Sequence, residues 1–482
     1  MTQAVLKERF LREYGRELVE RKAMLFVGAG LSIPAGFVDW RNLLRELASD
    51  LGLDVDKEMD LLSVAQFHKN TNESRHKIDQ TLIDEFSRKS QLTRNHELIA
   101  SLPVSTVWTT NYDTLLEKAF EGIGRRPDVK HTKEHLSKRV RGADVTVYKM
   151  HGDVSMPHEA VLTRDDYEEY DLKRGLFSEK LQGDLVSDTF LFLGFSFTDP
   201  NIDFILRRIR ILLGANRRTH FCVMKKPDEP TEQSGEGKAN HEYEVRRLEL
   251  RMQDLKRYGI LTVLVDDYGE IQELLLELNR ISHQREVFIS GSAYDYSPLG
   301  EEIIQDLSRA LGRELIQNNL NIISGFGLGI GERVLVGAME AIYSGEATAI
   351  DDRILIRPFP QSYPIGVSRE EMWEKYRQDM IGQAGHVVFI AGNKLDSTGN
   401  VAQANGVQRE FEIAKQHGKT LIPIGASGHV AAELWDEVYA NREQYFQRVD
   451  VTQELENLNN ATLSVAAYVA AIVAIIHKVN NR

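Results

Sequence analysis

Cysteine is nearly absent from this sequence, since Cys222 is the single thiol among 482 residues. A disulfide needs two cysteines, and the common structural zinc sites need several thiolates. The chain alone can therefore build neither. We expect a protein of the reducing cytoplasm that carries no zinc or other metal and needs no cofactor.

Long apolar segments are also missing. The stretch Leu463 to Ile476 has about 14 residues, whereas a membrane span needs about 20. The segment Met1 to Lys22 is charged and helical in pattern, and it lacks the apolar core of a signal peptide. We expect neither export nor membrane association, and we predict that Leu463 to Ile476 forms a buried or interface helix.

A basic stretch suited to nucleic acid is not found either. The 72 Asp and Glu residues outnumber the 59 Lys and Arg residues, which gives a net charge of −13 without a long basic run to offset it. Nucleic-acid-binding proteins usually carry a basic patch or stripe. We therefore expect no nucleic-acid partner, and we predict that the mixed-charge stretch Arg125 to Arg141 is a solvated loop or helix.

What the sequence does contain is a series of short apolar segments that end in glycine or polar residues. Their apolar, β-branched composition is typical of buried strands. In an open α/β sheet, ligands bind outside the carboxyl ends of the strands. We predict that one pocket is lined by the residues after four such strands: Gly28-Ala29-Gly30-Leu31-Ser32 after Leu25–Val27, Asn111 and Asp113 after Pro103–Thr109, His151-Gly152 after Val145–Met150, and Gly194-Phe195-Ser196 after Phe190–Leu193.

Each of these tips also has a simpler interpretation. Asn111 could cap a helix over Tyr112–Phe120, and Gly28-Ala29-Gly30 could be a tight turn without a ligand. His151 could be a core histidine that bonds the backbone. If the glycine turn does serve a ligand, its amides and the start of a following helix favour a phosphate.

A second alternation of strands and helices begins after a break near Ser282 to Arg285. The stretch Lys225 to His241 is predicted to be an exposed loop within the first domain, because the strand Ile260–Val265 still follows it. Helices are expected between strands, among them Trp40–Leu51 and Thr163–Leu181. The second half has predicted strands at Val287–Ile289, Asn321–Ile323, Arg353–Arg357, His386–Ile390 and Thr420–Ile424. We predict an α/β fold of two doubly wound, Rossmann-like domains, residues 1–283 and 284–482.

The motifs of the two halves resemble two known families. The glycine turn with Gly36, Asp39, Trp40 and Arg41, then Thr110-Asn111-Tyr112-Asp113, His151-Gly152 and Gly194-Phe195-Ser196, is similar to the sirtuin motif series in its order. In the second half, Ser290-Gly291-Ser292, the turn Gly325 to Gly331 and Arg377 resemble the SLOG family of nucleotide-sensing domains. The tandem resembles the effectors of the Thoeris anti-phage defence system.

The sirtuin resemblance implies chemistry on NAD+. It also shows departures, because the zinc module of four cysteines is missing and Thr110 stands where deacylases usually have Gln, so we expect a sirtuin-like domain without a zinc module. The favoured function is NAD+ hydrolysis that releases nicotinamide and ADP-ribose. Asn111 would orient the ribose or the attacking water, and His151 would act as a base, because an ordinary histidine titrates near neutral pH. The implied NAD+ contacts are Gly28, Ala29, Gly30, Ser32, Asp113, Gly194 and Ser196.

The SLOG resemblance implies an activating nucleotide, expected to be a cyclic ADP-ribose isomer made by a partner TIR-domain protein. Glycine turns present amides that can bind a pyrophosphate, and Arg and Lys can neutralise it. Arg377 could instead form a surface ion pair with Glu374 or Asp379, and Glu410 could be a plain surface carboxylate. The expected site consists of Ser290, Gly291, Gly325, Phe326, Gly327, Arg377, Lys394 and Glu410.

The sirtuin resemblance also implies assembly. We expect a homotetramer or larger oligomer, with the helix at Leu463 to Ile476 either in the interface or covering the second sheet. Two other function classes stay open. One is a protein deacylase or ADP-ribosyltransferase, and the other is a catalytically silent nucleotide sensor.

Overall fold

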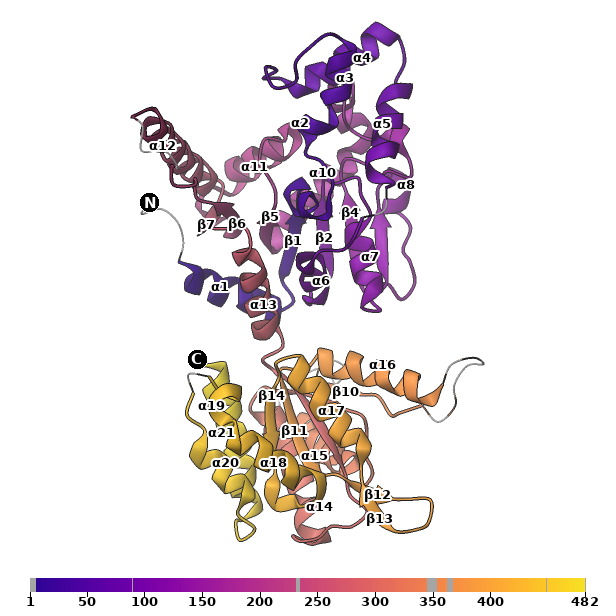
Figure 1. Ribbon diagram of the computed structural model, residues 1–482, viewed down its shortest axis with the longest axis vertical. Helices are drawn as coiled ribbons and strands as arrows, with labels where there is room; N and C mark the ends of the chain where they lie inside the picture. Colours follow the sequence, from indigo (N-terminus) through magenta and orange to yellow (C-terminus); the bar gives the residue numbers. More distant parts are fainter. Residues whose placement is uncertain are drawn as a thin grey trace. The chain divides into compact units, whose positions relative to one another are not determined.

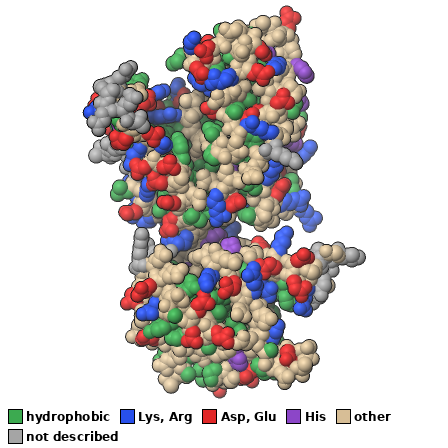
Figure 2. All heavy atoms as spheres, viewed as in Figure 1, with side chains coloured by type: hydrophobic (Ala, Val, Ile, Leu, Met, Phe, Trp, Pro, Cys, Tyr) green, Lys and Arg blue, Asp and Glu red, His purple; other side chains and the backbone are tan. Residues whose placement is uncertain are grey.

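The computed structural model of the chain describes residues 6–88, 90–230, 235–344, 353–360, 362, 366, 368–447 and 449–481. The chain forms two compact units, Met1–Ser282 and His283–Arg482. Each unit has its own sheet (Figure 1). In the part of the chain that the structure describes, no helix is long and apolar enough to cross a membrane. Figure 2 shows acidic and basic side chains mixed on the visible face of each unit.

The first unit is built on a seven-stranded parallel sheet with the order β3-β4-β2-β1-β5-β6-β7. Val27 of β1 pairs with Thr109 of β2 and Leu193 of β5. The turns after these three strands therefore leave the sheet side by side, at the point where the strand order reverses. Open sheets of this kind bind ligands there. The strands are β1 (Ala23–Val27), β2 (Thr106–Thr109), β3 (Pro127–Lys130), β4 (Val145–Lys149), β5 (Thr189–Leu193), β6 (His220–Lys225) and β7 (Ile260–Val265).

Helices cover both faces of this sheet (Figure 1). On one face α1, α6, α7 and α13 enclose a mainly aliphatic core, and on the other α10, α11 and α12 enclose one rich in aromatic rings. Helices α2 to α5 share a smaller core with Tyr112. The helices are α1 (Lys7–Val19), α2 (Trp40–Leu43), α3 (Arg45–Asp50), α4 (Leu61–Asn72), α5 (His76–Phe86), α6 (Arg94–Ser101), α7 (Leu115–Gly122), α8 (Lys133–Leu136), α9 (Arg164–Glu168), α10 (Tyr170–Ser187), α11 (Pro200–Leu213), α12 (Gly235–Arg257) and α13 (Glu270–Ser282).

The second unit has a five-stranded parallel sheet with the order β10-β9-β8-β11-β14 and an antiparallel pair, β12 with β13. Its strands are β8 (Glu286–Ser292), β9 (Asn321–Ser324), β10 (Ile354–Ile356), β11 (His386–Ala391), β12 (Asn393–Leu395), β13 (Val401–Gln403) and β14 (Thr420–Pro423). Its helices are α14 (Glu301–Gln317), α15 (Gly331–Ser344), α16 (Arg369–Gly382), α17 (Asn405–Gln416), α18 (His429–Ala440), α19 (Arg442–Tyr445), α20 (Thr452–Asn459) and α21 (Val465–Asn480).

Some local predictions were wrong. The stretch Arg125 to Arg141 is not only loop and helix, because it contains the edge strand β3. Asp128 and Lys130 of that strand are buried and form an ion pair of 2.8 Å, so charges conceal a strand pattern. The expected loop Lys225 to His241 is helical from Gly235 onward, and its residues 231–234 lie outside the described residues.

Two predicted helices are each divided by the structure. Trp40–Leu51 becomes α2 and α3, which meet at Leu44, where ψ is −2°. Thr163–Leu181 becomes α9 and α10, which meet at Glu169, where ψ is 0°. A ψ near zero departs from the regular α-helical value of about −42°, so the regular helix is interrupted at both places.

The apolar segment Leu463 to Ile476 lies within α21. Its large side chains, among them Tyr468, Ile472 and Ile476, are buried in the core of the second unit. The exposed positions of the helix include Ala466 and Ala470. Of the two alternatives for this segment, a helix in an interface or one that covers the second sheet, the structure shows the second.

Candidate active site

The turn after β1 lies directly against the turn after β5. Gly30 N donates to Gly194 O at 2.9 Å, and a Cβ at Gly28 would lie 2.5 Å from the same oxygen. Gly194 has a φ of +62°, which favours glycine. Only glycine allows this approach without displacing backbone. Ala29 and Gly30 remain exposed, although the amide of Gly30 is already engaged by Gly194 O.

No regular helix starts at this turn. Two short 3-10 turns, Ala29–Leu31 and Ile33–Ala35, follow β1 instead. The expectation of a helix N-terminus for a phosphate was therefore wrong, because Pro34 and the left-handed Gly36 end the helical path early. The amides of Gly28, Gly30, Leu31 and Ser32 donate to backbone oxygens, so within this turn the amide of Ala29 is what remains for a phosphate.

Asn111 turns its side chain toward this glycine turn. Its Nδ2 donates to Gly28 O at 3.2 Å and to Ser32 Oγ at 3.0 Å, and Ser32 Oγ donates to Asp113 Oδ2 at 2.8 Å. A carbonyl oxygen can only accept, so Gly28 O determines which end of the amide faces it. The other end, Oδ1, is buried and accepts no hydrogen bond from any residue that the structure describes.

This arrangement differs from a helix cap. Helix α7 starts at Leu115, and its N-cap residue Thr114 makes no side-chain cap bond. Asp113 Oδ1 accepts from Leu115 N at 3.0 Å, so Asp113 forms the turn into the helix. Both carboxylate oxygens of Asp113 and the hydroxyl of Ser32 are thus engaged within the chain, and they hold the amide of Asn111.

His151 follows β4 and is paired with a carboxylate. Its Nε2 lies 3.0 Å from Asp199 Oδ2, although the contact is not aligned as a hydrogen bond. Tyr167 donates its hydroxyl to the same oxygen at 3.0 Å. The side chains of His151 and Asp199 are 7% and 8% exposed. His151 is therefore not a core histidine that bonds the backbone.

Asp199 is the residue that the sequence reasoning missed. Its Oδ1 accepts from Asn201 N and Ile202 N at 2.9 and 3.1 Å, which caps α11. Burial alone would raise the pKa of this carboxyl. The charge of His151 and, to a smaller extent, the hydrogen bonds that Asp199 accepts hold the pKa below its usual value. The Asp-Pro pair before α11 indicates a cap in the sequence, but nothing there indicates His151 as the partner.

Ser196 and Gly194 belong to the loop that carries Asp199. Ser196 Oγ lies 2.7 Å from Thr198 Oγ1 within that loop and is exposed. Phe195 packs on Phe26, with the ring centroids 4.8 Å apart. Gly194 thus touches the glycine turn directly, whereas Ser196 makes no described contact with Asn111 or His151.

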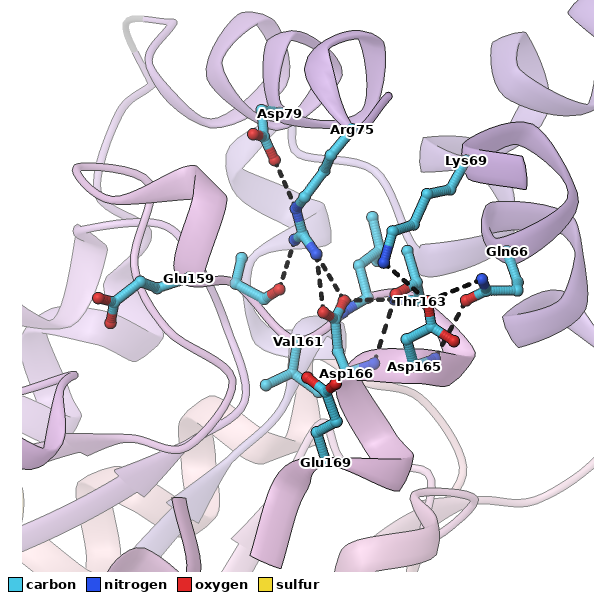
Figure 3. A network of polar contacts seen from close by, with 12 residues as sticks. Gln66, Lys69, Arg75, Asp79, Glu159, Val161, Thr163, Asp165, Asp166 and Glu169 are labelled. Atoms are coloured by element: carbon cyan, nitrogen blue, oxygen red, sulfur yellow. Dashed lines mark hydrogen bonds and ion pairs between the residues drawn. The ribbon is translucent and has the colours of Figure 1, made fainter. Parts of the chain in front are cut away.

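A cluster of charged residues holds the segment that follows His151 (Figure 3). Arg75, at the start of α5, donates to both oxygens of Asp166 at 2.8 and 2.7 Å and also to Ala160 O. The next residue, Val161, donates its N–H to His151 O at 2.8 Å and accepts from the Tyr112 hydroxyl at 2.7 Å. The start of α5 is thus tied to the backbone of His151 through Ala160 and Val161.

An open cavity of about 680 Å³ lies farther along the same edge, between α12 and the residues Lys225 and Tyr268 that end or follow β6 and β7. Asn111 and His151 do not line it. Within the described ranges, no group of three or more His, Cys, Asp or Glu side chains could hold a metal ion.

The carboxyl edge of the second sheet brings together another group of predicted residues. Ser290 Oγ donates to Glu410 Oε2 at 2.6 Å, and Arg377 Nε donates to Glu410 Oε1 at 3.3 Å. The guanidinium also lies 4.9 Å from the ring centre of Phe359. Burial raises the pKa of Glu410, although Ser290 and Arg377 lower it in part.

The simpler interpretations of Arg377 and Glu410 were wrong. Glu374 pairs with Arg409 at 2.9 Å, and Asp379 pairs with Arg357, so neither is the partner of Arg377. Glu410 is 6% exposed and is no surface carboxylate. Acidic residues stand close to Arg377 in the sequence, on the same helix, but its partner Glu410 comes from a different helix, α17.

The glycine turn after β9 approaches the tip of β8. A Cβ at Gly327 would lie 1.9 Å from Gly291 O, so glycine is required there. Phe326 has a φ of +59°, and its N–H bonds Ser324 Oγ at 3.1 Å. Gly325 lies against the ring of Phe359. Lys394, on β12, is exposed and joins none of these residues through a hydrogen bond or ion pair in the described chain.

Comparisons with known proteins agree with both halves. Residues 105–247 match the SIR2-like domain family, and residues 270–479 match the Sir2- and TIR-associating SLOG family. The chain is 43% identical over 477 residues to the "NAD(+) hydrolase ThsA" of Bacillus cereus (strain MSX-D12), covering 98% of each chain. It is 42% identical over 436 residues to the protein of the same name from Acinetobacter baumannii (strain 532279), covering 89% of this chain and 90% of that one.

A shorter match links the chain to a different defence protein. It is 27% identical over 213 residues to "Defense-associated sirtuin 2" of Bacillus subtilis, which is 43% of this chain and 21% of that protein. The predicted fold class and the resemblance to a sirtuin-like domain joined to a SLOG domain are confirmed. With two relatives above 40% identity over most of its length, the chain belongs to the ThsA family of NAD(+) hydrolases.

Proposed function

We propose that this chain hydrolyses NAD+ to nicotinamide and ADP-ribose in anti-phage defence, and that a nucleotide bound to its second unit activates it. The observation that carries the proposal is the buried, unengaged Oδ1 of Asn111 at the turn after β2, beside the glycine turn of β1. Membership of a family whose relatives are named NAD(+) hydrolases supports the choice of substrate.

The amide of Asn111 suits the handling of a hydroxyl. Because Gly28 O and Ser32 Oγ fix Nδ2, the free Oδ1 has a fixed direction and can accept from a ribose hydroxyl or from the attacking water. A held reactant loses little entropy at the moment of reaction, which lowers the barrier. Gly28, Ala29, Gly30 and Gly194 would line the dinucleotide with their backbone, and Ser32, Asp113 and Ser196 would lie in support. The amides of Gly28 and Gly30 already donate to backbone oxygens, so the amide of Ala29 would donate to the ligand.

His151 suits the role of the base. In hydrolysis the bond between ribose C1′ and the nicotinamide nitrogen breaks, and its electron pair stays with nicotinamide, which leaves as a neutral molecule. The oxygen of a water molecule forms the new bond to C1′, and its proton passes to the imidazole. Asp199 stabilises the imidazolium that results. General base assistance of this kind is worth about 10²–10⁴-fold.

A protein deacylase or ADP-ribosyltransferase is the alternative. The sequence has one cysteine, Cys222, which is buried, and Thr110 occupies the position where deacylases usually have Gln. Both features favour water over an acylated peptide as the second reactant. We expect NAD+ to be a substrate and no zinc or other cofactor to be required.

For the second unit we propose a cyclic ADP-ribose isomer, made by a TIR-domain partner protein, as the activator. Gly291, Gly325, Phe326 and Gly327 bring backbone to the carboxyl edge beside the buried Ser290, and we expect a pyrophosphate to bind there. Arg377 and Glu410 lie beside it, and Lys394 would come from the β12 hairpin. Moving a population from 1:99 to 99:1 needs about 10⁴-fold tighter binding to the active state, which charged contacts to a pyrophosphate can supply.

We also propose that the chain works as a homotetramer or larger assembly in the cytoplasm, without nucleic acid or membrane. Because α21 is buried within its own unit, the interface would have to involve other surfaces. Light scattering at micromolar concentration, with and without ligand, tests this. A strict monomer in both conditions would contradict it.

One experiment tests the chemistry and the regulation together. Purified chain is incubated with NAD+, with and without cyclic ADP-ribose isomers, and free nicotinamide and zinc content are measured. We expect nicotinamide and ADP-ribose to form without any acyl peptide, faster with one isomer, in zinc-free protein. A requirement for an acyl peptide would support the deacylase alternative, and absence of any turnover would support a silent sensor.

A further inference from the structure

A buried lysine connects the two loops that carry Asn111 and His151. Lys149 is the last residue of β4 and is fully buried. Its ammonium lies 2.9 Å from Glu117 Oε1 of α7 and also bonds Asp153 Oδ2. It donates in addition to the backbone oxygens of Tyr112, at 3.3 Å, and Asp113. One ammonium thus has four acceptors from three parts of the chain.

These acceptors belong to the two loops at the proposed site. Tyr112 and Asp113 directly follow Asn111, and Asp153 lies in the turn that follows His151. A backbone bond from Val154 N to Tyr112 O, at 3.1 Å, runs alongside. Asp153 is itself fixed, because its Oδ1 accepts from Ser155 N at 2.8 Å and from Ser155 Oγ at 2.6 Å. The ammonium therefore links one loop to the other through groups that cannot easily move.

Lys149 and Asp153 favour their charged forms although they are buried. Burial would lower the pKa of Lys149, but Glu117 and Asp153 raise it overall. Burial likewise works to raise the pKa of Asp153, yet Lys149 holds it below the usual value, whereas burial keeps the pKa of Glu117 raised. Buried ion clusters contribute little net stability compared with well-packed apolar residues, so stability alone is a poor reason for this one.

We propose that Lys149 is a positioning residue, whose ammonium fixes the loop of Asn111 against the loop of His151 so that both side chains act on one NAD+ molecule. The proposal rests on the proposed function. Misplacement of a reacting group by about 1 Å can cost about 10²-fold in rate. The two loops come from different strands, and the ammonium sets their spacing beyond the end of the sheet ladder.

The chain offers a matched control. Lys130, on the neighbouring strand β3, is also buried and paired with a carboxylate, Asp128, but it touches neither loop. Lys149→Met and Lys130→Met both remove a buried ammonium. We expect kcat for nicotinamide release to fall by about 10²-fold in Lys149→Met with less than a few-fold change in KM, and to stay within a few-fold of the parent in Lys130→Met. Equal kcat values in the two variants would overturn the proposal.

Lys149→Met leaves Glu117 and Asp153 buried without their cation, which can prevent folding. A neutral variant, Lys149→Met with Glu117→Gln and Asp153→Asn, avoids this. It should fold and show the same loss of kcat, and a kcat within a few-fold of the parent would overturn the proposal. Failure of both Lys149 variants to fold would assign the lysine to structure and overturn it as well.

A readout without turnover separates this proposal from the proposed function. Crystal structures of the parent and the neutral variant give the distance between the Cα atoms of Asn111 and His151. We expect this distance to change by about 1 Å, which is the order that matters for rate. An unchanged distance would overturn the positioning role even if the parent proves inactive on NAD+, whereas an inactive parent alone would overturn the proposed function.

Discussion

Each sheet has a buried carboxylate at its carboxyl edge, and the pKa values of the two are shifted in opposite directions. In the first unit, Asp199 faces His151, the hydroxyl of Tyr167 and the start of α11, and its pKa lies below the usual value. In the second unit, Glu410 faces Ser290 and Arg377, and burial raises its pKa. The first environment keeps a charge that supports a base. The second weakens a charge that would otherwise repel an anionic ligand.

The cations differ in the same way. At the first edge the buried Lys149 and the half-buried Arg75 bind protein carboxylates and carbonyls behind the site. At the second edge Arg377 belongs to the proposed site itself, and its partner Glu410 lies at the same place. Catalysis needs fixed groups, whereas a sensor needs a contact that a ligand can exchange. The same sheet edge serves either purpose, depending on where the charges lie.

The largest effect on this contrast is expected from the catalytic residues of the first unit. Replacement of His151 or Asn111 by Ala should lower nicotinamide release by about 10²–10⁴-fold, because the base or the oriented acceptor is lost. The exposed His158→Ala variant, in the same loop region, is the matched control and should keep full activity. A product assay with circular dichroism on all three variants decides this. Activity within a few-fold of the parent in either loop variant would remove the assignment.

The second test concerns the sensor arginine. Arg377→Ala should leave basal turnover unchanged but lower the affinity for the cyclic ADP-ribose isomer by about 10²-fold. The variant loses a charged hydrogen bond, and such bonds typically contribute about 1.5–3 kcal/mol. Arg409→Ala removes a surface pair with Glu374 and serves as the control. Calorimetric titration of both variants gives the affinities. Equal affinity in parent and Arg377→Ala would place the sensor site elsewhere.

A smaller effect is expected from the carboxylate behind His151. Asp199→Asn should slow nicotinamide release by about tenfold, which is about 1.4 kcal/mol. Without the carboxylate, the imidazolium that forms during the reaction loses its nearest anion, and a product assay measures the loss of rate. Asp184→Asn removes another buried carboxylate, one that bonds Trp108 and Lys180, without touching His151. Equal rates in Asp199→Asn and Asp184→Asn would separate Asp199 from the base.

The sequence predicts the strands and their tips well for a physical reason. Strands in a parallel sheet are buried on both faces, so β1, β2 and β5 appear as continuous apolar runs, and the glycine or polar residues after them mark the ligand edge. Strand β3 fails this test because Asp128 and Lys130 point inward as a pair. The sequence shows two charged residues there, and only the structure shows that they form an ion pair.

Partners across the fold could not be predicted in the same way. Asp199 comes to His151 from the loop after β5, three strands away from β4 in the sheet, and Glu410 comes to Arg377 from another helix. The acidic residues close to Arg377 in the sequence were the wrong partners. Spacing along the sequence does not show that α17 packs beside Arg377. In the sequence, Lys149 stands at the end of an apolar strand. A lysine is rarely buried unless it is paired, so this position indicates a partner.

The smallest expected effect is a pH dependence of stability that isolates Glu410. Its pKa is higher in the folded chain than the ordinary value of 4.5, so the folded state binds more protons than the unfolded state between the two values. This group therefore stabilises the fold fully below pH 4.5, and the contribution is lost as the pH rises through the folded pKa. Each pH unit of that window is worth about 1.4 kcal/mol.

The measurement must separate Glu410 from carboxyls that act in the opposite sense. Asp199 and Glu374 have lowered pKa values, so their contributions are lost as the pH falls. Denaturant unfolding of the full chain and of Glu410→Gln at a series of pH values between about 4.5 and 7 removes these shared terms when the two curves are subtracted. The difference should favour the parent progressively toward low pH. A flat difference would mean that Glu410 titrates as an ordinary carboxyl, and the contrast between a charge-keeping and a charge-weakening edge would then rest on Asp199 alone.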